Sequence, residues 1–124
     1  MEKQLNILYV DDEQLNLELF SIVFNNKFHV ITATSGQEGL QKLDEHEDIA
    51  VVISDMRMPE MNGIEFISNA KKKFANLYYF ILTGFEINEE IADALKQKLI
   101  DRYFKKPFNS KEIEQTIYEL VDIK

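Results

Sequence analysis

Short apolar runs alternate along this chain with segments in which apolar residues recur every three or four positions. The runs lie at residues 7–10, 30–31, 50–53, 77–82 and 103–104. A continuous apolar run is typical of a strand that is buried on both faces, as in a parallel sheet. The pattern therefore predicts five short strands, each followed by a helix.

The apolar residues of each predicted helix share one face, which we expect to pack on the sheet. These faces consist of Leu15, Leu19, Ile22 and Val23; Leu40 and Leu43; Ile64, Ile67, Ala70 and Phe74; Ile87, Ile91, Ala94, Leu95 and Leu99; and Ile113, Ile117, Leu120 and Val121. Residues that favour a helix start precede three of the helices, namely Ser35, Asn88 and Asn109.

Strands and helices that alternate in this way, joined by short loops, form a parallel sheet with helices on both faces. We expect residues 1–124 to form one α/β domain with a doubly wound five-stranded parallel sheet of strand order 2-1-3-4-5, the flavodoxin-like (βα)5 arrangement. In this order the winding reverses between the first and third strands. Ligands bind outside the carboxyl ends of the strands at such a point.

Charge and composition exclude several functions. The net charge is −8, which argues against direct nucleic-acid binding and suits a metal cation or a basic partner. There is no cysteine, so disulfides and Cys-based zinc sites are excluded. The longest apolar run has six residues, too short to cross a membrane, and the N-terminus lacks the apolar core of a signal peptide. We therefore expect a cytoplasmic protein.

Acidic residues follow the two strands at the predicted switch point. Asp11 and Asp12 come directly after residues 7–10, and Asp55 follows residues 50–53. Neighbouring carboxylates repel one another, and a hard divalent cation such as Mg²⁺ relieves the repulsion. Thr83 and Lys106 follow the fourth and fifth strands and reach the same rim. A carboxylate with Mg²⁺, a hydroxyl and an ammonium group is the donor set of a phosphoryl-transfer site, in which an aspartate can be the nucleophile.

Four motifs in register resemble those of the receiver domain of two-component response regulators, over essentially the whole chain. They are Val10-Asp11-Asp12-Glu13, Asp55-Met-Arg-Met-Pro59 with Asn62-Gly63, Leu82-Thr83-Gly84, and Lys105-Lys106-Pro107-Phe108. The resemblance implies a signalling module, not a turnover enzyme, that catalyses its own phosphorylation and dephosphorylation. It implies a histidine kinase or phosphotransfer protein as the phosphodonor.

The resemblance also assigns roles to single residues. It implies that Asp55 is the phosphoacceptor and that Asp12 and Asp55 ligate Mg²⁺ directly. Asp11 would act partly through water, and the backbone carbonyl of Arg57 would complete the metal site. The side chains of Thr83 and Lys106 would contact the phosphoryl group.

The implied output of the domain is a conformational switch. Tyr103 matches the aromatic switch residue of the fifth strand and would act together with Thr83. The Lys106–Pro107 bond is cis in the family. The signalling face consists of the fourth helix, fifth strand and fifth helix. It would serve a downstream target, a fused output domain or a phosphorylation-dependent dimer. Leu99 and Ile100 stand where many members have Gly-Ala.

Two other functions fit the pattern less well. An Asp-nucleophile phosphatase of the haloacid-dehalogenase type needs a second acid two residues after the nucleophile, where this chain has Arg57. A flavodoxin-like cofactor binder needs a phosphate-cradling loop after the first strand, where the acids at 11–13 would repel a phosphate. The cognate kinase, the target and the presence of further domains are left open.

Overall fold

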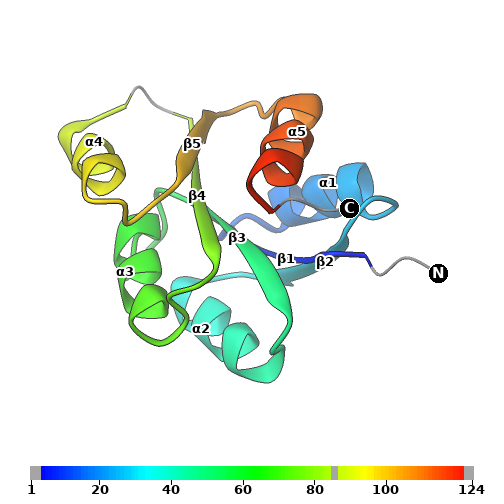
Figure 1. The fold of residues 1–124 in the computed structure, drawn as a ribbon, viewed down its shortest axis with the longest axis horizontal. Helices are drawn as coiled ribbons and strands as arrows, with labels where there is room; N and C mark the ends of the chain where they lie inside the picture. The colour runs from blue at the N-terminus through cyan, green and yellow to red at the C-terminus, as the bar shows by residue number, and fades with distance from the viewer. Residues whose placement is uncertain (1–3, 85–86, 122–124) are drawn as a thin grey trace.

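A five-stranded parallel sheet with the strand order β2-β1-β3-β4-β5 forms the centre of the molecule, which confirms the predicted fold class (Figure 1). The computed structural model describes residues 4–84 and 87–121. The strands are β1 (Asn6–Val10), β2 (His29–Ala33), β3 (Ile49–Asp55), β4 (Tyr78–Thr83) and β5 (Arg102–Lys105). The helices are α1 (Gln14–Phe24), α2 (Gly36–Glu45), α3 (Gly63–Lys73), α4 (Glu89–Lys96) and α5 (Ser110–Val121).

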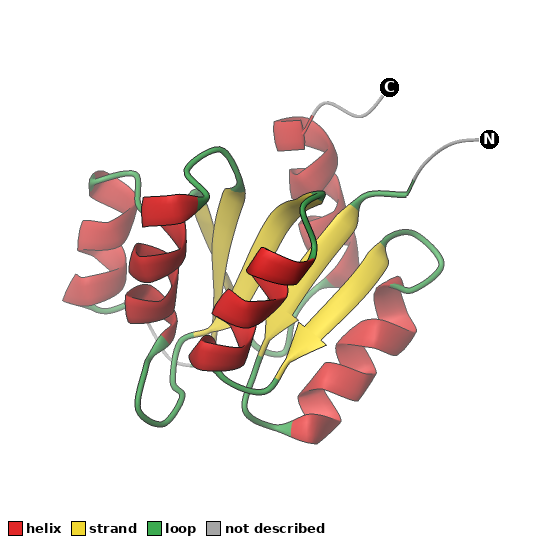
Figure 2. Ribbon diagram, turned by 90° about the horizontal axis from the view of Figure 1, so that it is seen from below, coloured by secondary structure: helices red, strands yellow, loops and turns green. Residues whose placement is uncertain are grey.

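The helices cover both faces of the sheet, and the sheet divides the hydrophobic core into two layers (Figures 1 and 2). Helices α1 and α5 pack on one face together with the rings of Tyr9 and Phe80. Helices α2, α3 and α4 pack on the other face, around Leu8, Val52 and Ile81. Strands β1, β3 and β4 are almost wholly buried, which explains their uninterrupted apolar runs.

Helix α1 packs on the sheet with a different side from the one that the sequence pattern predicted. Every residue of the predicted face is exposed, by between 39% and 76%. That face consists of Leu15, Leu19, Ile22 and Val23. The buried side consists of Leu17, Phe20 and Phe24. The prediction of this core face is therefore wrong, although the helix itself lies where it was expected.

The reason is that α1 carries apolar residues on two sides, so periodicity does not decide which of them is buried. The side with the larger aromatic surface packs on the sheet, since aromatic rings remove more apolar area from water than aliphatic side chains do. Phe20 stacks on Tyr9 of β1, with 4.1 Å between ring centroids. Phe24 packs against Phe108, which follows β5.

The predicted helix starts are confirmed. The side chains of Ser35, Asn88 and Asn109 each accept a hydrogen bond from the backbone N–H three residues later. A fourth cap was not predicted: Asn62 and Glu65 form a reciprocal capping box at the start of α3. This cap fixes the end of the loop that begins at the carboxyl end of β3.

Helix α4 ends in a Schellman motif, with Lys98 in the left-handed region at φ 61°. Leu99 N–H donates to the Ala94 carbonyl and Lys98 N–H to the Leu95 carbonyl. Lys71 of α3 donates to the carbonyls of Lys98 and Leu99 and so ties this end of α4 to α3. The predicted stripe of α4 is shorter than expected: Leu99 lies beyond the helix and Ile87 before it.

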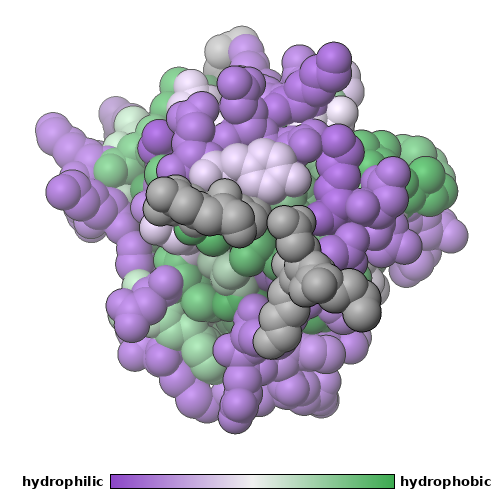
Figure 3. Space-filling view, turned by 45° about the vertical axis from the view of Figure 1, so that its right-hand side comes forward, coloured by the Kyte–Doolittle hydropathy of each residue, from purple (hydrophilic) through white to green (hydrophobic). Residues whose placement is uncertain are grey.

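The outer surface carries mostly polar side chains. On the face drawn in Figure 3, hydrophilic residues predominate, with hydrophobic residues exposed between them. Among residues 4–84 and 87–121, no helix has both the length and the hydropathy needed to cross a bilayer.

Candidate functional site

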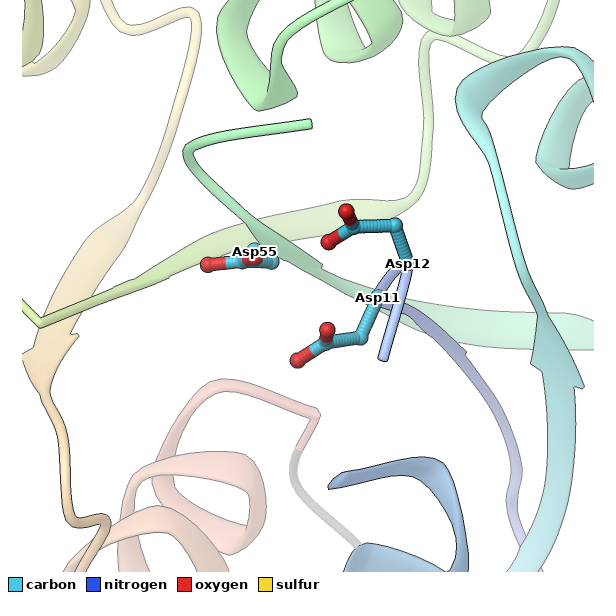
Figure 4. A group of neighbouring side chains, drawn as sticks. All are labelled: Asp11, Asp12 and Asp55. Atoms are coloured by element: carbon cyan, nitrogen blue, oxygen red, sulfur yellow. The ribbon is translucent and has the colours of Figure 1, made fainter. Parts of the chain in front are cut away.

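Three aspartates come together where the central strands end (Figure 4). Asp11 and Asp12 directly follow β1, and Asp55 is the last residue of β3. Because Val10 pairs with Ser54, the two strands end level with each other. One carboxylate oxygen from each aspartate lies within 4.8 Å of those from the other two. The structure therefore brings together the three acids that the sequence placed at the switch point.

Lys106 lies between two of these carboxylates. Its Nζ is 3.2 Å from Oδ2 of Asp11 and 3.1 Å from Oδ1 of Asp55. Burial alone would lower the pKa of Lys106, but the carboxylates of Asp55 and Asp11 outweigh burial and raise it. The ammonium group therefore keeps its charge and offsets part of the repulsion between the aspartates.

The backbone around Lys106 fixes the side chain at this rim. Lys106 N–H donates to the Thr83 carbonyl at 2.7 Å, which continues the pairing of β4 with β5. The Lys106–Pro107 peptide bond is cis, as expected. Thr83 is buried at the end of β4, in line with the end of β3. The hydroxyl thus stands on β4, the strand next to that of Asp55, and the ammonium group comes from the residue after β5.

Asp11 and Asp55 lie in different environments, although both are buried. Asp11 has no exposed surface and accepts hydrogen bonds on both oxygens. Asp55 is 7% exposed, and Lys106 is the one described side chain that binds its carboxylate in an ion pair. Burial, followed by the nearby charges of Asp11 and Asp12, raises the pKa of Asp55, against the attraction of Lys106. Asp12 is exposed.

The loop after β3 is held against the backbone of Asp55. Gly63 N–H donates to the Met56 carbonyl at 2.8 Å. A Cβ at Gly63 would collide with the Asp55 carbonyl oxygen and with the Ile81 side chain. Glycine is therefore required where α3 starts, because the backbone of β3 at Asp55 passes directly beside it.

A groove of about 500 Å³ lies between the loop after β3 and the start of α4. Its lining residues are Met56, Arg57, Met58, Pro59, Asn62, Asn88 and Glu90. Arg57 is exposed on this loop. The groove begins at Met56, the residue that directly follows Asp55.

Tyr103, the predicted switch residue, is half-buried on β5 and packs against the core layer under α4. It pairs in register with Ile81 of β4, two residues before Thr83. The aromatic ring and the buried hydroxyl thus lie on neighbouring strands.

Sequence reasoning missed one residue of the site, Tyr9. Its hydroxyl donates a 2.6 Å hydrogen bond to Oδ2 of Asp11. Burial, and then the hydrogen bond to Asp11, hold the pKa of the Tyr9 phenol far above its usual value, so the hydroxyl stays a donor. The available signal was the spacing, because residues two apart on a strand point to the same side.

The donor set fits a hard divalent cation. Three carboxylates offer oxygen ligands within one small volume, and one of them is exposed. Mg²⁺ prefers a site with a small number of carboxylates and room for water ligands over a site closed on all sides by protein ligands. Receiver domains bind Mg²⁺ at an acidic pocket of this kind.

Comparison with known proteins identifies relatives. A family model described as the response regulator receiver domain matches residues 7–118. Response regulator SaeR of Staphylococcus aureus is 31% identical over 117 residues, which are 94% of this chain and 50% of SaeR. The hydrogenase transcriptional regulatory protein HoxA of Cupriavidus necator is 25% identical over 98% of this chain and 25% of HoxA. The chain thus spans half or less of the length of these two relatives.

Solved structures give the same result. Chemotaxis protein CheY4 of Vibrio cholerae has a TM-score of 0.85 and 27% identity, covering 94% of this chain and 98% of CheY4. A response regulator receiver domain protein (CheY-like) of Methanospirillum hungatei has a TM-score of 0.87 and 27% identity, covering 97% of this chain and 95% of that one.

Proposed function

Because the chain belongs to the response regulator receiver domain family, the signalling modules of two-component systems, we propose that Asp55 accepts a phosphoryl group from a histidine kinase or a phosphotransfer protein. A carboxylate oxygen of Asp55 attacks the phosphorus of the donor's phosphohistidine. The P–O bond forms as the P–N bond breaks, and the imidazole leaves with the electron pair. The observation that carries this proposal is the setting of Asp55: buried at a strand end, beside two acids and one lysine.

The other residues of the rim serve the transferred group. Lys106, already 3.1 Å from Oδ1 of Asp55, offsets the charge of the phosphoryl oxygens. The Thr83 hydroxyl donates to one of those oxygens. Asp12, Asp55 and the carbonyl of Arg57 would hold Mg²⁺ directly, and Asp11 partly through water. When bound, the ion would neutralise charge on the phosphoryl group.

The phosphoryl group then acts as a switch. It adds charge and acceptor oxygens, and Thr83 and Lys106 bind these oxygens by moving inward. The ring of Tyr103 then moves into the space that Thr83 leaves. The surface formed by α4, β5 and α5 changes as a result. That surface engages a downstream target, a fused output domain or a second copy of the domain.

Phosphorylation by a small-molecule phosphodonor tests the function. We expect the intact mass of the wild-type chain to increase by one phosphoryl group in Mg²⁺ and not after chelation. Asp55→Asn removes the nucleophile, so its mass should not change. Asp48→Asn is the matched control, because Asp48 is exposed on the turn before β3, and it should be labelled like the wild type. A label that survives in Asp55→Asn contradicts the assignment.

A further inference from the structure

We propose that Tyr9 is a positioning residue for the metal site: its hydroxyl holds the Asp11 carboxylate in the orientation that binds Mg²⁺. This inference rests on the proposed function, because it assumes that the three aspartates bind the metal. It adds a residue that none of the motifs at the rim contains.

The first support is the network of donors around Asp11. Oδ1 accepts the Glu13 N–H at 2.9 Å. Oδ2 accepts the Tyr9 hydroxyl at 2.6 Å, the Asn16 side-chain amide at 3.2 Å and the Lys106 ammonium at 3.2 Å. The Tyr9 bond is the shortest of the four. The charge of the carboxylate strengthens all four bonds, and the Tyr9 hydroxyl makes the closest of them from a side chain that is itself fixed in the core.

The second support is that Tyr9 itself cannot move easily. Its side chain is 1% exposed, and its ring stacks on Phe20 of α1. Lys106 is less buried and divides its ammonium between Asp11 and Asp55. When a phosphoryl group on Asp55 attracts Lys106, Tyr9 still holds Oδ2. Tyr9 is thus the closest of the donors that keep Asp11 in place in both states.

The consequence for the metal follows from the repulsion within the site. Without the Tyr9 hydroxyl, the Asp11 carboxylate loses its shortest bond while Asp12 and Asp55 still repel it. It then rotates away from them and presents its oxygens less well. Partners of this kind, which orient a metal ligand without touching the metal, typically change metal affinity by 10- to 100-fold when they are removed.

Tyr9→Phe tests the proposal, with Tyr79→Phe as its matched control. Both rings are buried, and each hydroxyl donates one hydrogen bond, Tyr79 to the Phe74 carbonyl at 2.7 Å, far from the aspartates. Calorimetric titration gives the Mg²⁺ dissociation constant of each unphosphorylated variant. We expect an increase of about tenfold in Tyr9→Phe and no change in Tyr79→Phe.

A second measurement separates positioning from catalysis. The Mg²⁺ concentration for half-maximal phosphorylation should increase by the same factor in Tyr9→Phe, while the rate at saturating Mg²⁺ stays near that of the wild type. Equal or tighter Mg²⁺ binding in Tyr9→Phe overturns the proposal, as does an equal loss in Tyr79→Phe. Wild-type protein that is not phosphorylated at all would instead overturn the proposed function.

The wild-type chain offers a test that needs no variant. With ¹³C-labelled tyrosine, Mg²⁺ titration should shift the Cζ resonance of Tyr9 and leave that of Tyr79 in place, because only Tyr9 is bonded to the carboxylate cluster. The backbone amide of Glu13, which donates to the other oxygen of Asp11, should shift together with it. A Tyr9 resonance that does not respond to Mg²⁺ contradicts the proposal.

Discussion

The ionised carboxylate of Asp55 destabilises the folded chain when the site holds no cation. Its pKa is raised above the ordinary value of 3.8, chiefly by burial and then by the charges of Asp11 and Asp12. A carboxyl with a raised folded-state pKa binds its proton more tightly in the fold than in the unfolded chain. The free energy of unfolding therefore decreases as pH rises from about 3.8 through the folded-state pKa.

We expect Asp55→Asn to unfold at a higher temperature than the wild type at pH 7 in a chelator, and the difference to shrink on acidification. Mg²⁺ at ten times its dissociation constant should stabilise the wild type by about 1.4 kcal/mol and the variant by less. Thermal unfolding followed by circular dichroism measures both effects. A variant that is less stable than the wild type at pH 7 contradicts the argument.

Arg57 should lengthen the lifetime of the phosphorylated state. It stands two residues beyond Asp55 and lines the groove between the loop after β3 and the start of α4. A guanidinium has fixed donors suited to phosphate oxygens, and its bulk obstructs in-line attack by water. We expect phosphorylated Arg57→Ala to lose phosphate faster than the wild type in Mg²⁺, measured by intact mass over time. Equal or slower decay would remove Arg57 from this role.

At the residue scale, the sequence predicted the aspartates, Thr83 and Lys106 because each stands within two residues of the end of an apolar run. Strand ends in a parallel sheet meet at one edge, so position along the chain was sufficient. Tyr9 was not predicted, because inside an apolar run a tyrosine is read as a core residue. The role of its hydroxyl becomes visible only in the structure, where the Asp11 carboxylate is fully buried and needs hydrogen-bond donors from the protein.

At the scale of elements, the start of α3 controls the geometry of the acceptor loop. Gly63→Ala should lower the free energy of unfolding by about 1–3 kcal/mol, since the added methyl group meets the Asp55 backbone, which cannot move aside. Gly84→Ala is the matched control, because a Cβ there meets nothing within 4 Å, and we expect it to change stability by less than about 0.5 kcal/mol. Urea denaturation measures both. Equal stabilities of the two variants would show that the loop adapts.

Helix α1 shows where element prediction fails. Its position after the first strand could be predicted, but its buried side does not follow from a pattern that offers two apolar faces. The packing partners decide, and they come from distant parts of the chain, such as Phe108. The single-stripe helices α3 and α5 had no such ambiguity, and Ile64, Ile67, Ile113 and Ile117 are buried as expected.

At the scale of the whole molecule, phosphorylation of Asp55 should change the conformation of the surface formed by α4, β5 and α5. We expect a phosphoryl mimic such as beryllofluoride to change backbone NMR shifts at residues 83–84, 87–88 and 99–106, beyond the aspartates. Residues 85 and 86 belong to the same predicted region but lie outside the described residues. Thr83→Ala should reduce the changes at 99–106 while the mimic still binds. Changes confined to the three aspartates and their neighbours contradict the switch.

The fold itself was predictable because the order of strands follows from alternation and short loops. The geometry before β5 was not, since Leu99 and Ile100 gave no indication of the turn they form. That turn depends on Lys98 in a left-handed conformation and on Lys71, an α3 residue far away in the sequence. Contacts of this kind are set by the assembled structure.

The tie between Lys71 and the end of α4 gives that helix the mechanics of a lever. Two carbonyls bound by one ammonium group, the Schellman turn, and the hydrogen bonds between Asp101 and the backbone of Tyr79 fix one end of α4 as a fulcrum. The opposite end, near Asn88, borders the groove beside the acceptor. Under the proposed phosphorylation of Asp55, a displacement at that end would tilt the whole helix, with the largest movement near Asn88 and the smallest at the fixed end.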